Sequence, residues 1–532
     1  VAAVASPSFA IKDMSDEDRF LLWKHRVTLT DNKKALLKLF SCTQWGNERH
    51  VRSLLELIPL WVDVDVEDAL ELLGDAYVVD AIRSLALRSL ATVMDEELAC
   101  YLLSLVQAMR HDPADKPHLA DWVIARAVAS PMKLAIPLHW YLTVEASTLH
   151  YGRLYKSIHN RLYAALQLHN PMASGGESVL EVLRRQDHFV AALNSLAAET
   201  KRYKESRPKQ IERLFMLLGS GGAFAHLTQL TSVVNLPNQP EVGVTGIVPE
   251  ESEILKSAMN PIKLVFRTAS DDTHTVLVKC SNDLRRDQLV LATIDLMNML
   301  LQREGVDLKL STYRVTATSS DTGMVEFVES FSLQRILEEY DNDIRAFLIV
   351  NGPSPESGVV DPDVLDTFVR SCAGYCVVSF LLAIGDRHLD NLLLTTDGQL
   401  FHVDFEYILG SDPRPAAFSP PMKLSEQMVH AMGGRGSKEF SDFNKYCCKA
   451  YLILRRSARL FVNLFDLVAD PNVLDRGGKL ASASPKLLER FQLDLTNEEA
   501  VQYMQNIIQE SLGMIFPKLV DTVHAWRQYW KS

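Results

Sequence analysis

Residues 385–405 read Gly-Asp-Arg-His-Leu-Asp-Asn-Leu-Leu-Leu-Thr-Thr-Asp-Gly-Gln-Leu-Phe-His-Val-Asp-Phe, two apolar runs around an Asp-Gly pair. Asp-Gly between apolar runs is the strongest short-range signal for a β-hairpin with a two-residue turn. If Thr396 faces Gln399 in this hairpin, the register predicts that Asn391 faces Asp404. Directly opposed residues hold their Cβ atoms about 5 Å apart on one face of the sheet. The sequence therefore predicts a carboxylate and an amide side by side.

Such a pair suits Mg²⁺, which prefers oxygen ligands and bridges nucleotide phosphates. We therefore expect Asn391 and Asp404 to hold one or two Mg²⁺ ions. Asp386 precedes Asn391 by five residues, the spacing between the catalytic Asp and the metal-binding Asn of protein kinases. His388 is a second candidate base, because a histidine ordinarily titrates near neutral pH. Taken singly, an Asp or His in a loop is more often a cap, but the combination favours phosphoryl transfer.

Lys279 ends the apolar strand Val276-Leu-Val-Lys, as the phosphate-pairing lysine ends Val-Ala-Ile-Lys in protein kinases. A lysine at a strand end is more often an edge residue whose ammonium reaches solvent. Its place in a β-rich segment upstream of the hairpin favours the phosphate role. Asp287, early in the next predicted helix, is placed to pair with Lys279, and the alternative is favourable placement in the helix dipole.

Apolar residues recur at spacings of three and four from Asp16 to about Leu230, which predicts helix after helix in a solenoid-like array. Pro and Gly then punctuate residues 233–249. The period shifts towards two beyond them, with strands predicted at 262–267, 275–279, 313–318 and 324–328, and a helix at 284–300. From residue 332 the chain reads as mainly helical. The predicted fold class is α+β, a helical solenoid-like domain followed by a two-lobed domain.

The composition bounds the function. The 532 residues are 47% hydrophobic and 23% charged, as in a globular protein. The net charge of -12 argues against a nucleic-acid binder that relies on overall positive charge and leaves a local basic patch open. The longest strongly apolar stretch, residues 375–385, is shorter than the roughly 20 residues that span a bilayer. Seven cysteines without a CxxC pair fit reduced thiols in the cytosol. We therefore expect a cytoplasmic protein whose membrane contact, if any, is peripheral.

The sequence motifs at 385–394 and 401–405 resemble those of the phosphatidylinositol 3- and 4-kinase superfamily. Three further motifs are similar to those of its class III, vacuolar-sorting members: Asp283-Leu-Arg-Arg-Asp-Gln-Leu, Pro420-Pro-Met-Lys-Leu and Gln528-Tyr-Trp-Lys. The motif Val66-Glu-Asp-Ala-Leu-Glu-Leu-Leu resembles their helical domain. The resemblance implies a helical accessory domain at 1–232 and a linker with the start of the small lobe at 233–258. It implies a kinase small lobe at 259–331 and a large lobe with a membrane-proximal C-terminal helix at 332–532. The family's N-terminal lipid-binding domain has no counterpart here, which suggests a helical-plus-kinase fragment.

The resemblance implies roles for particular residues. Lys279 would contact ATP phosphates with support from Asp287, and Asp386 and His388 would serve the reacting hydroxyl. The backbone of Glu326, Phe327 and Val328 would form the adenine hinge, with Tyr313 beside the nucleotide pocket.

The activation loop would run from Asp404 to Leu424, with Arg414 and Lys423 as its basic residues. Two positive charges suit unphosphorylated phosphatidylinositol better than a headgroup with several phosphates. The family's Asp-Phe-Gly reads Asp404-Phe405-Glu406 here, and the loop at 268–274 has no Gly. Glycine permits backbone conformations closed to Glu, so the conformation at Glu406 is the main point for the structure to decide.

The expected activity is transfer of the ATP γ-phosphoryl to the 3-hydroxyl of phosphatidylinositol, for endosomal sorting and autophagy. The alternatives are a phosphatidylinositol 4-kinase and a weakly active pseudokinase scaffold. The resemblance further implies ATP with Mg²⁺ or Mn²⁺, a regulatory pseudokinase-type subunit, a Beclin-like coiled-coil subunit, and peripheral location on endosomal and autophagic membranes. The aromatic and basic residues of 526–532 suit a membrane interface.

Overall fold

The computed structural model describes residues 14–513 except 114–115, 174–175, 203–205, 257–259, 281–282, 354, 414–419, 469–470 and 475–483. Arg414 and the C-terminal residues 526–532 therefore lie outside the described part. The chain divides into two compact units. The first comprises Val1–Leu180 and Arg459–Ala469, and the second comprises Glu181–Ala458 and Asp470–Ser532.

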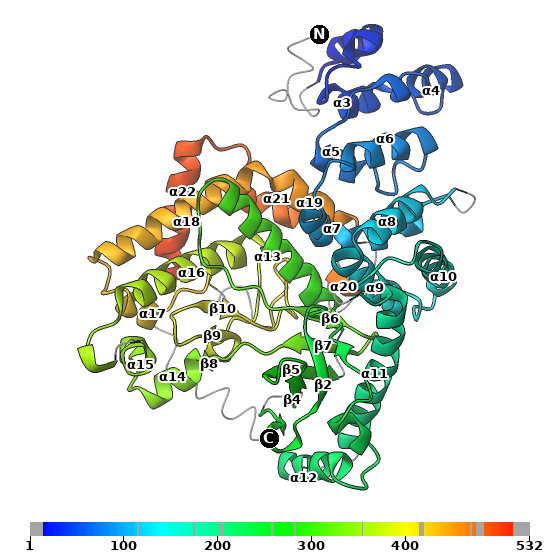
Figure 1. Ribbon diagram of the computed structural model, residues 1–532. Coiled ribbons are helices and arrows are strands. Elements are labelled where there is room, and N and C mark those ends of the chain that lie inside the picture. The colour runs from blue at the N-terminus through cyan, green and yellow to red at the C-terminus, as the bar shows by residue number, and fades with distance from the viewer. Residues whose placement is uncertain are drawn as a thin grey trace. The chain divides into compact units, whose positions relative to one another are not determined.

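The first unit is built from short helices packed in succession, which confirms the predicted helical array (Figure 1). Acidic residues open several of them, as Asp95 and Glu96 do in α7, where they favour the positive end of the helix dipole. Ser15 and Asp18 form a capping box at the start of α2. The helices are α2 (Asp16–Lys24), α3 (Ala35–Cys42), α4 (Glu48–Leu55), α5 (Val66–Glu71), α6 (Asp80–Leu90), α7 (Asp95–Ala108), α8 (His118–Ala129), α9 (Ile136–Glu145) and α10 (Gly152–His169).

A segment from far along the sequence joins this unit. Helix α19 (Ala458–Asp466) carries Arg459, whose Nη2 lies 2.9 Å from Asp68 Oδ1 and 2.8 Å from Glu71 Oε2, both on α5. Asn463 Nδ2 donates to the Glu67 carbonyl at 2.6 Å. Polar contacts with α5 therefore hold α19 in the helical unit, although the chain on either side of it belongs to the second unit.

Helices α11 (Val179–Thr200) and α12 (Arg207–Leu218) precede the predicted boundary at residue 232 but pack with the strands beyond it. The rings of Phe189 and Phe266 are 5.8 Å apart, and Gln186 Nε2 donates to the Asn235 carbonyl at 3.0 Å. The domain limits at 232, 258 and 331 remain predictions.

The small β-rich lobe contains a sheet in the order β1-β2-β4-β5-β7-β6, with β3 paired to β4. Its hairpin β4–β5 confirms the predicted pair of strands around the loop at 268–274, and β6 and β7 confirm the second pair. The strands are β1 (Val234–Asn235), β2 (Gly243–Ile247), β3 (Glu253–Ile254), β4 (Ile262–Thr268), β5 (Thr273–Cys280), β6 (Val315–Ala317) and β7 (Thr322–Glu326). Helix α13 (Arg285–Arg303) follows β5, and Gly305 after it has a φ of +69°.

The larger lobe is helical around one long buried helix, α16, which packs against α18 and strand β10. A three-stranded sheet in the order β10-β9-β8 lies beside it. The elements are β8 (Phe331–Ser332), α14 (Leu333–Glu339), α15 (Ile344–Asn351), α16 (Pro362–Leu381), β9 (Leu392–Leu394), β10 (Leu400–His402), α17 (Glu426–Ala431), α18 (Lys438–Arg456), α20 (Pro471–Leu474), α21 (Ser484–Phe491) and α22 (Asn497–Gly513). The predicted α+β class with a small and a large lobe is confirmed.

The hairpin β9–β10 forms, but the predicted two-residue turn and its register are wrong. Leu394 pairs with Leu400, and Thr395 N donates to the Gln399 carbonyl at 3.1 Å, so three residues, 396–398, make the loop. Gly398 takes a φ of +88°, which a glycine adopts without strain. The shift of one residue makes Asn391 face Val403 and not Asp404.

Helix α16 is long and apolar enough to cross a membrane by length and composition, and 78% of its apolar window is buried inside the protein. This burial is typical of the central helix of a packed lobe.

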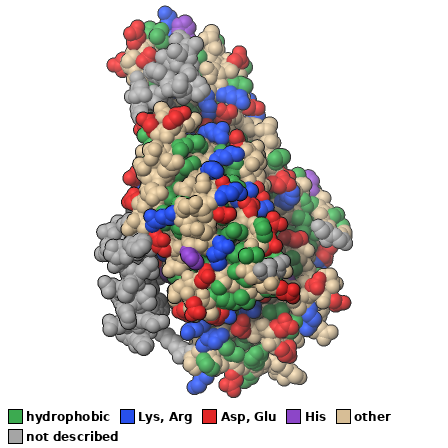
Figure 2. All heavy atoms as spheres, turned by 90° about the vertical axis from the view of Figure 1, so that its left-hand side faces the viewer, with side chains coloured by type: hydrophobic (Ala, Val, Ile, Leu, Met, Phe, Trp, Pro, Cys, Tyr) green, Lys and Arg blue, Asp and Glu red, His purple; other side chains and the backbone are tan. Residues whose placement is uncertain are grey.

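On the face shown in Figure 2, Lys and Arg side chains are interspersed with Asp and Glu side chains.

Candidate active site

The loop between α16 and β9 brings Asp386 and His388 together. His388 Nε2 lies 4.0 Å from Asp386 Oδ2, and the imidazole side chain is 39% exposed while the carboxylate is 20% exposed. Asp386 has a φ of +51°, a left-handed conformation that Asp tolerates better than most residues. Its Oδ1 is shielded from solvent and has no hydrogen-bond partner among the described residues. Both predicted catalytic side chains are therefore neighbours, with one polar carboxylate atom left for a ligand.

Asn391 joins this loop to the hairpin. Its Nδ2 donates to the Asp386 carbonyl at 3.0 Å, and its own carbonyl accepts from Val403 N at 3.1 Å. The engaged amide nitrogen leaves the side-chain oxygen as the acceptor available to a cation. Asp404 follows Val403 directly. The backbones of the two predicted metal ligands, Asn391 and Asp404, are therefore close together, although the two residues are not cross-strand partners.

Arg387 is a buried residue of this loop to which the sequence assigned no role. Only 5% of it is exposed, and its guanidinium donates to Gly385 O at 2.8 Å, to Val403 O at 2.8 Å and to Asp404 O. It also lies over the Phe405 ring, with Cζ 5.7 Å from the centroid. The guanidinium therefore ties the Asp386 loop to the backbone that carries Asp404. Its position inside the Asp-Arg-His word was the only signal that the sequence offered.

Lys279, Asp287 and Asp404 form one electrostatic cluster. Burial raises the pKa of the Asp287 carboxyl, the Lys279 ammonium opposes that rise, and the Asp404 carboxylate adds to it. Asp287 Oδ1 also accepts from Phe405 N at 3.4 Å. Lys279 reaches the cluster from β5, where it pairs with Gly323 of β7. The structure therefore brings together residues from β5, α13 and the end of the hairpin.

Tyr313 is buried beside the same cluster. Burial raises the pKa of its hydroxyl well above the ordinary value, and the negative charges of Asp287 and Asp404 add to the rise. Its ring lies 6.0 Å from that of Phe401 on β10. Tyr313 of the small lobe thus contacts the larger lobe through Phe401, and its place beside a nucleotide remains a prediction.

The predicted hinge follows β7. Glu326 N donates to the Arg314 carbonyl at 2.8 Å and Phe327 N to the Thr275 carbonyl at 3.3 Å, so the sheet occupies both donors. Val328 N has no hydrogen-bond partner among the described residues. Of the three predicted hinge residues, Val328 therefore offers the backbone donor for a nucleotide base.

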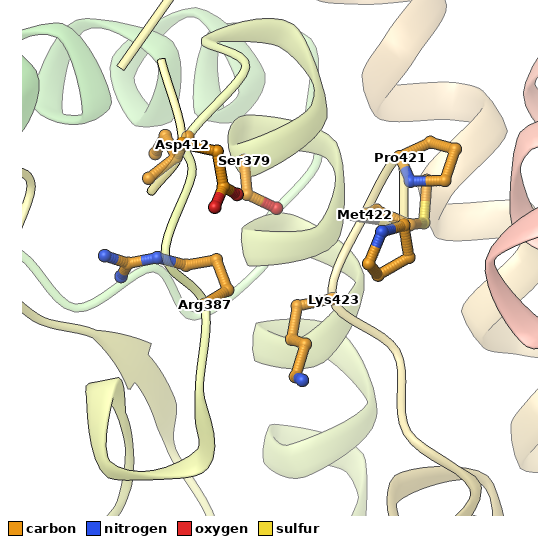
Figure 3. Close-up of a pocket in the computed structure, with 8 residues that line it drawn as sticks. Ser379, Arg387, Asp412, Pro421, Met422 and Lys423 are labelled. Carbon is orange, nitrogen blue, oxygen red and sulfur yellow. The ribbon is translucent and has the colours of Figure 1, made fainter. Parts of the chain in front are cut away.

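Lys423 lines a small cavity of about 20 Å³ under the activation loop. Arg387 and Asp412 lie on one side of α16 and Pro421 and Met422 on the other, with Ser379 of α16 between them (Figure 3). Asp412 Oδ2 accepts from Asp386 N at 3.1 Å, which connects this cavity to the catalytic loop. The second predicted basic residue of the loop, Arg414, lies outside the described residues.

Glu406 does not need the conformation that glycine permits. The positive φ angles of this segment fall on Asp404 (+61°), Leu409 (+54°) and Gly410 (+76°), while Glu406 lies outside the left-handed region. Its carbonyl accepts a hydrogen bond from Arg286 Nη1. The loop therefore accommodates a Glu at the position of the family's Gly.

The site fits a divalent cation shared with phosphates. Two carboxylates, Asp287 and Asp404, raise each other's energy when both are charged, and a cation between phosphates and Asp404 would relieve that repulsion. No group of three His, Cys, Asp or Glu side chains within the described ranges can hold a metal by itself. This donor set suits Mg²⁺, which is commonly bound through one or two protein oxygens together with substrate phosphates.

Comparisons with known proteins agree with this geometry. The family model "Phosphatidylinositol 3- and 4-kinase" matches residues 274–476, and the model "Phosphoinositide 3-kinase family, accessory domain (PIK domain)" matches residues 8–173. The chain is 41% identical over 524 residues to the root isoform of phosphatidylinositol 3-kinase from Glycine max, across 98% of this chain and 64% of that protein. The chain belongs to the phosphatidylinositol 3-kinase family.

Two further relatives are named phosphatidylinositol 3-kinase VPS34. The protein from Arabidopsis thaliana is 40% identical over 98% of this chain and 64% of its own length. The protein from Saccharomyces cerevisiae is 34% identical over 96% of this chain and 63% of its own length. The chain thus spans slightly less than two thirds of the curated phosphatidylinositol 3-kinases that it matches. Within it, the accessory-domain match falls on the helical unit, and the kinase match covers every predicted site residue from Lys279 to Lys423.

Proposed function

We propose that this chain is a lipid kinase that transfers the γ-phosphoryl of ATP to the 3-hydroxyl of phosphatidylinositol. The observation that carries the proposal is the double link from Arg387 and Asn391 to the backbone around Asp404. These bonds hold the proposed catalytic pair Asp386 and His388 beside the proposed metal ligand. Phosphoryl transfer asks mainly for such positioning and for charge neutralisation.

Each residue has a role in this proposal. Lys279, supported by Asp287, binds the phosphates, and the backbone of Val328 with the neighbouring Tyr313 receives the base. His388 is more exposed than Asp386 and would take the proton of the lipid hydroxyl, while the Asp386 carboxylate, 4.0 Å away, would stabilise the resulting imidazolium. Asn391 and Asp404 hold Mg²⁺, with Mn²⁺ as an alternative. The bound cation supplies charge neutralisation at the β- and γ-phosphates.

The lipid headgroup lies against the activation loop in this proposal. Lys423 and Arg414 are the loop's basic residues, and Asp412 offsets part of that charge. A headgroup with several phosphates calls for a larger basic cluster, so we propose unphosphorylated phosphatidylinositol as the substrate.

Labelled ATP and vesicles of phosphatidylinositol test the proposal, with identification of the phosphorylated hydroxyl. Product at the 3-position with wild-type protein, absent with Asp404→Asn, supports it. Product at the 4-position makes the chain a 4-kinase. No product at any position, with ATP bound normally, makes it a pseudokinase scaffold.

We also propose that the protein acts peripherally on endosomal and autophagic membranes, with a regulatory pseudokinase-type subunit and a Beclin-like coiled-coil subunit. The support is the family resemblance, together with the helical unit, whose stacked helices offer extended surfaces of the kind that bind partners. Purification of the tagged full-length protein from its own cells, followed by identification of stoichiometric partners, tests this. Recovery of the kinase alone would contradict it.

A further inference from the structure

Arg286 is a buried arginine in the first turn of α13, next to Asp287, and 7% of it is exposed. Its Nε donates to the Val473 carbonyl on α20 at 2.8 Å. Its Nη1 donates to the Glu406 carbonyl at the root of the activation loop. One guanidinium thus joins three segments of the second unit that are far apart in sequence.

The first turn of α13 therefore holds the activation loop by two consecutive residues. Asp287 Oδ1 accepts from Phe405 N at 3.4 Å, and Arg286 donates to the next residue's carbonyl. Together the two contacts fix the backbone directly after Asp404. That backbone is unusual, because Asp404 has a φ of +61°, and a strained conformation persists only where surrounding contacts impose it.

Arginine is suited to this place for a physical reason. A guanidinium presents its donors in a rigid fork and so reaches two carbonyls in different directions, which a lysine ammonium on a flexible stem does less well. Its positive charge also lies beside the backbone carbonyl of Glu406, an interaction that is independent of the Glu406 side chain. Hydrogen bonds from charged donors are about twice as strong as those from neutral donors. Loss of the two Arg286 hydrogen bonds should therefore strongly destabilise the conformation of this backbone.

We propose that Arg286 is a positioning residue of the phosphoryl-transfer site. It holds Glu406, and through it the left-handed backbone of Asp404, in the orientation that the reaction needs. It does not touch the nucleotide or the lipid itself. The proposal deepens the proposed function and rests on it for the reaction concerned, while the backbone contact stands on the structure alone.

The adjacent Arg285 provides a matched control. It is buried to the same degree, with 6% exposed, and it forms an ion pair with Asp283 just before α13, with Nη2 2.6 Å from Asp283 Oδ2. Arg285→Met and Arg286→Met therefore remove equal side chains and equal charges from neighbouring positions. Arg286→Met also removes the hydrogen bond to the Glu406 carbonyl.

The experiment compares wild type, Arg286→Met, Arg286→Lys and Arg285→Met in three measurements. These are turnover on phosphatidylinositol vesicles, equilibrium binding of a fluorescent ATP analogue without divalent metal, and hydrogen exchange of the backbone amides of residues 404–412. We expect Arg286→Met to lower kcat at least tenfold and to speed the exchange of these amides at least tenfold, while analogue binding changes less than threefold. Arg286→Lys should be intermediate, and Arg285→Met should stay within twofold of wild type in all three.

Exchange and turnover of Arg286→Met equal to those of Arg285→Met would overturn the proposal. If Arg286→Met does not fold, Arg286→Lys decides, since the proposal requires faster exchange at 404–412 in that variant and wild-type exchange overturns it. Wild-type protein that phosphorylates no lipid would overturn the proposed function separately, because the exchange comparison does not depend on activity.

Discussion

The side chain of Asn391 donates a 3.0 Å hydrogen bond to the backbone carbonyl of Asp386. Asn391 in turn accepts from Val403 N at 3.1 Å, so a single residue connects the loop of the proposed base to the strand that precedes Asp404. These contacts involve backbone groups and the Asn391 side chain, not the carboxylates of Asp386 or Asp404. Replacing either carboxylate by an uncharged side chain should therefore leave the backbone of the site in place.

Asp404→Asn should lower turnover by at least about 100-fold, because the lost charge is a proposed cation ligand at the developing transition state. Asn is isosteric with Asp and tolerates the left-handed φ of +61°, so the fold should be retained. Turnover and thermal unfolding measured on the same preparation check this. Activity within threefold of wild type would remove Asp404 from the metal site.

Glu406→Gly should leave turnover unchanged or raise it. The substitution removes a negative charge near the phosphates and keeps the carbonyl that Arg286 binds. The added glycine gives the unfolded chain more backbone freedom, which should lower the free energy of unfolding by about 0.4–1 kcal/mol. Glu406→Gln removes the charge without adding that freedom and serves as the control. A drop in turnover of both variants at unchanged nucleotide affinity would show that the carboxylate itself takes part in the reaction.

Lys279→Met should lower turnover on the order of 100-fold, since the ammonium is the cation of the cluster formed with Asp287 and Asp404. Arg267→Met on the neighbouring strand β4 is the control. Arg267 is exposed and donates to the Thr228 carbonyl, and its replacement should change turnover less than twofold. Steady-state kinetics with varied ATP separate the two, and equal losses would point to general damage of the sheet.

The sequence predicted the parts of the site that depend on local pattern. The strands that carry Lys279 and the helix that carries Asp287 follow from apolar periodicity, and the Asp-Gly pair correctly marked the hairpin. The register was missed by one residue, because Gly398 serves as the left-handed residue of a three-residue loop and not of a two-residue turn. Turn types that share the same dipeptide differ in backbone angles that composition does not reveal.

Apolar periodicity and turn signals could not predict contacts between segments that are distant in sequence. Arg387 and Arg286 look like surface residues by type, yet both are buried because each binds several backbone carbonyls of other segments. The packing of α19 with the helical unit was missed for the same reason. Its sequence is an ordinary amphipathic helix, and only tertiary structure reveals that Asp68 is its partner.

Arg459→Ala should destabilise the protein by about 1 kcal/mol at pH 7, a value discounted because the Arg459 side chain is 42% exposed. Burial raises the pKa of the Asp68 carboxyl, whereas Arg459 and Lys34 lower it. A carboxyl with a raised folded pKa destabilises the fold as pH rises through that pKa, and without Arg459 the pKa rises further.

The cost of Arg459→Ala should therefore be largest at a pH well above the raised pKa of Asp68, and it should shrink as the pH falls through that pKa. Thermal unfolding between pH 4 and pH 7 measures the difference from wild type. Arg88→Ala is the control, because Arg88 is 44% exposed and its partner Asp63 is 49% exposed, so its cost should be smaller and should vary less with pH. A cost for Arg459→Ala that is constant across this range would show that the arginine contributes through packing and not through the charge of Asp68.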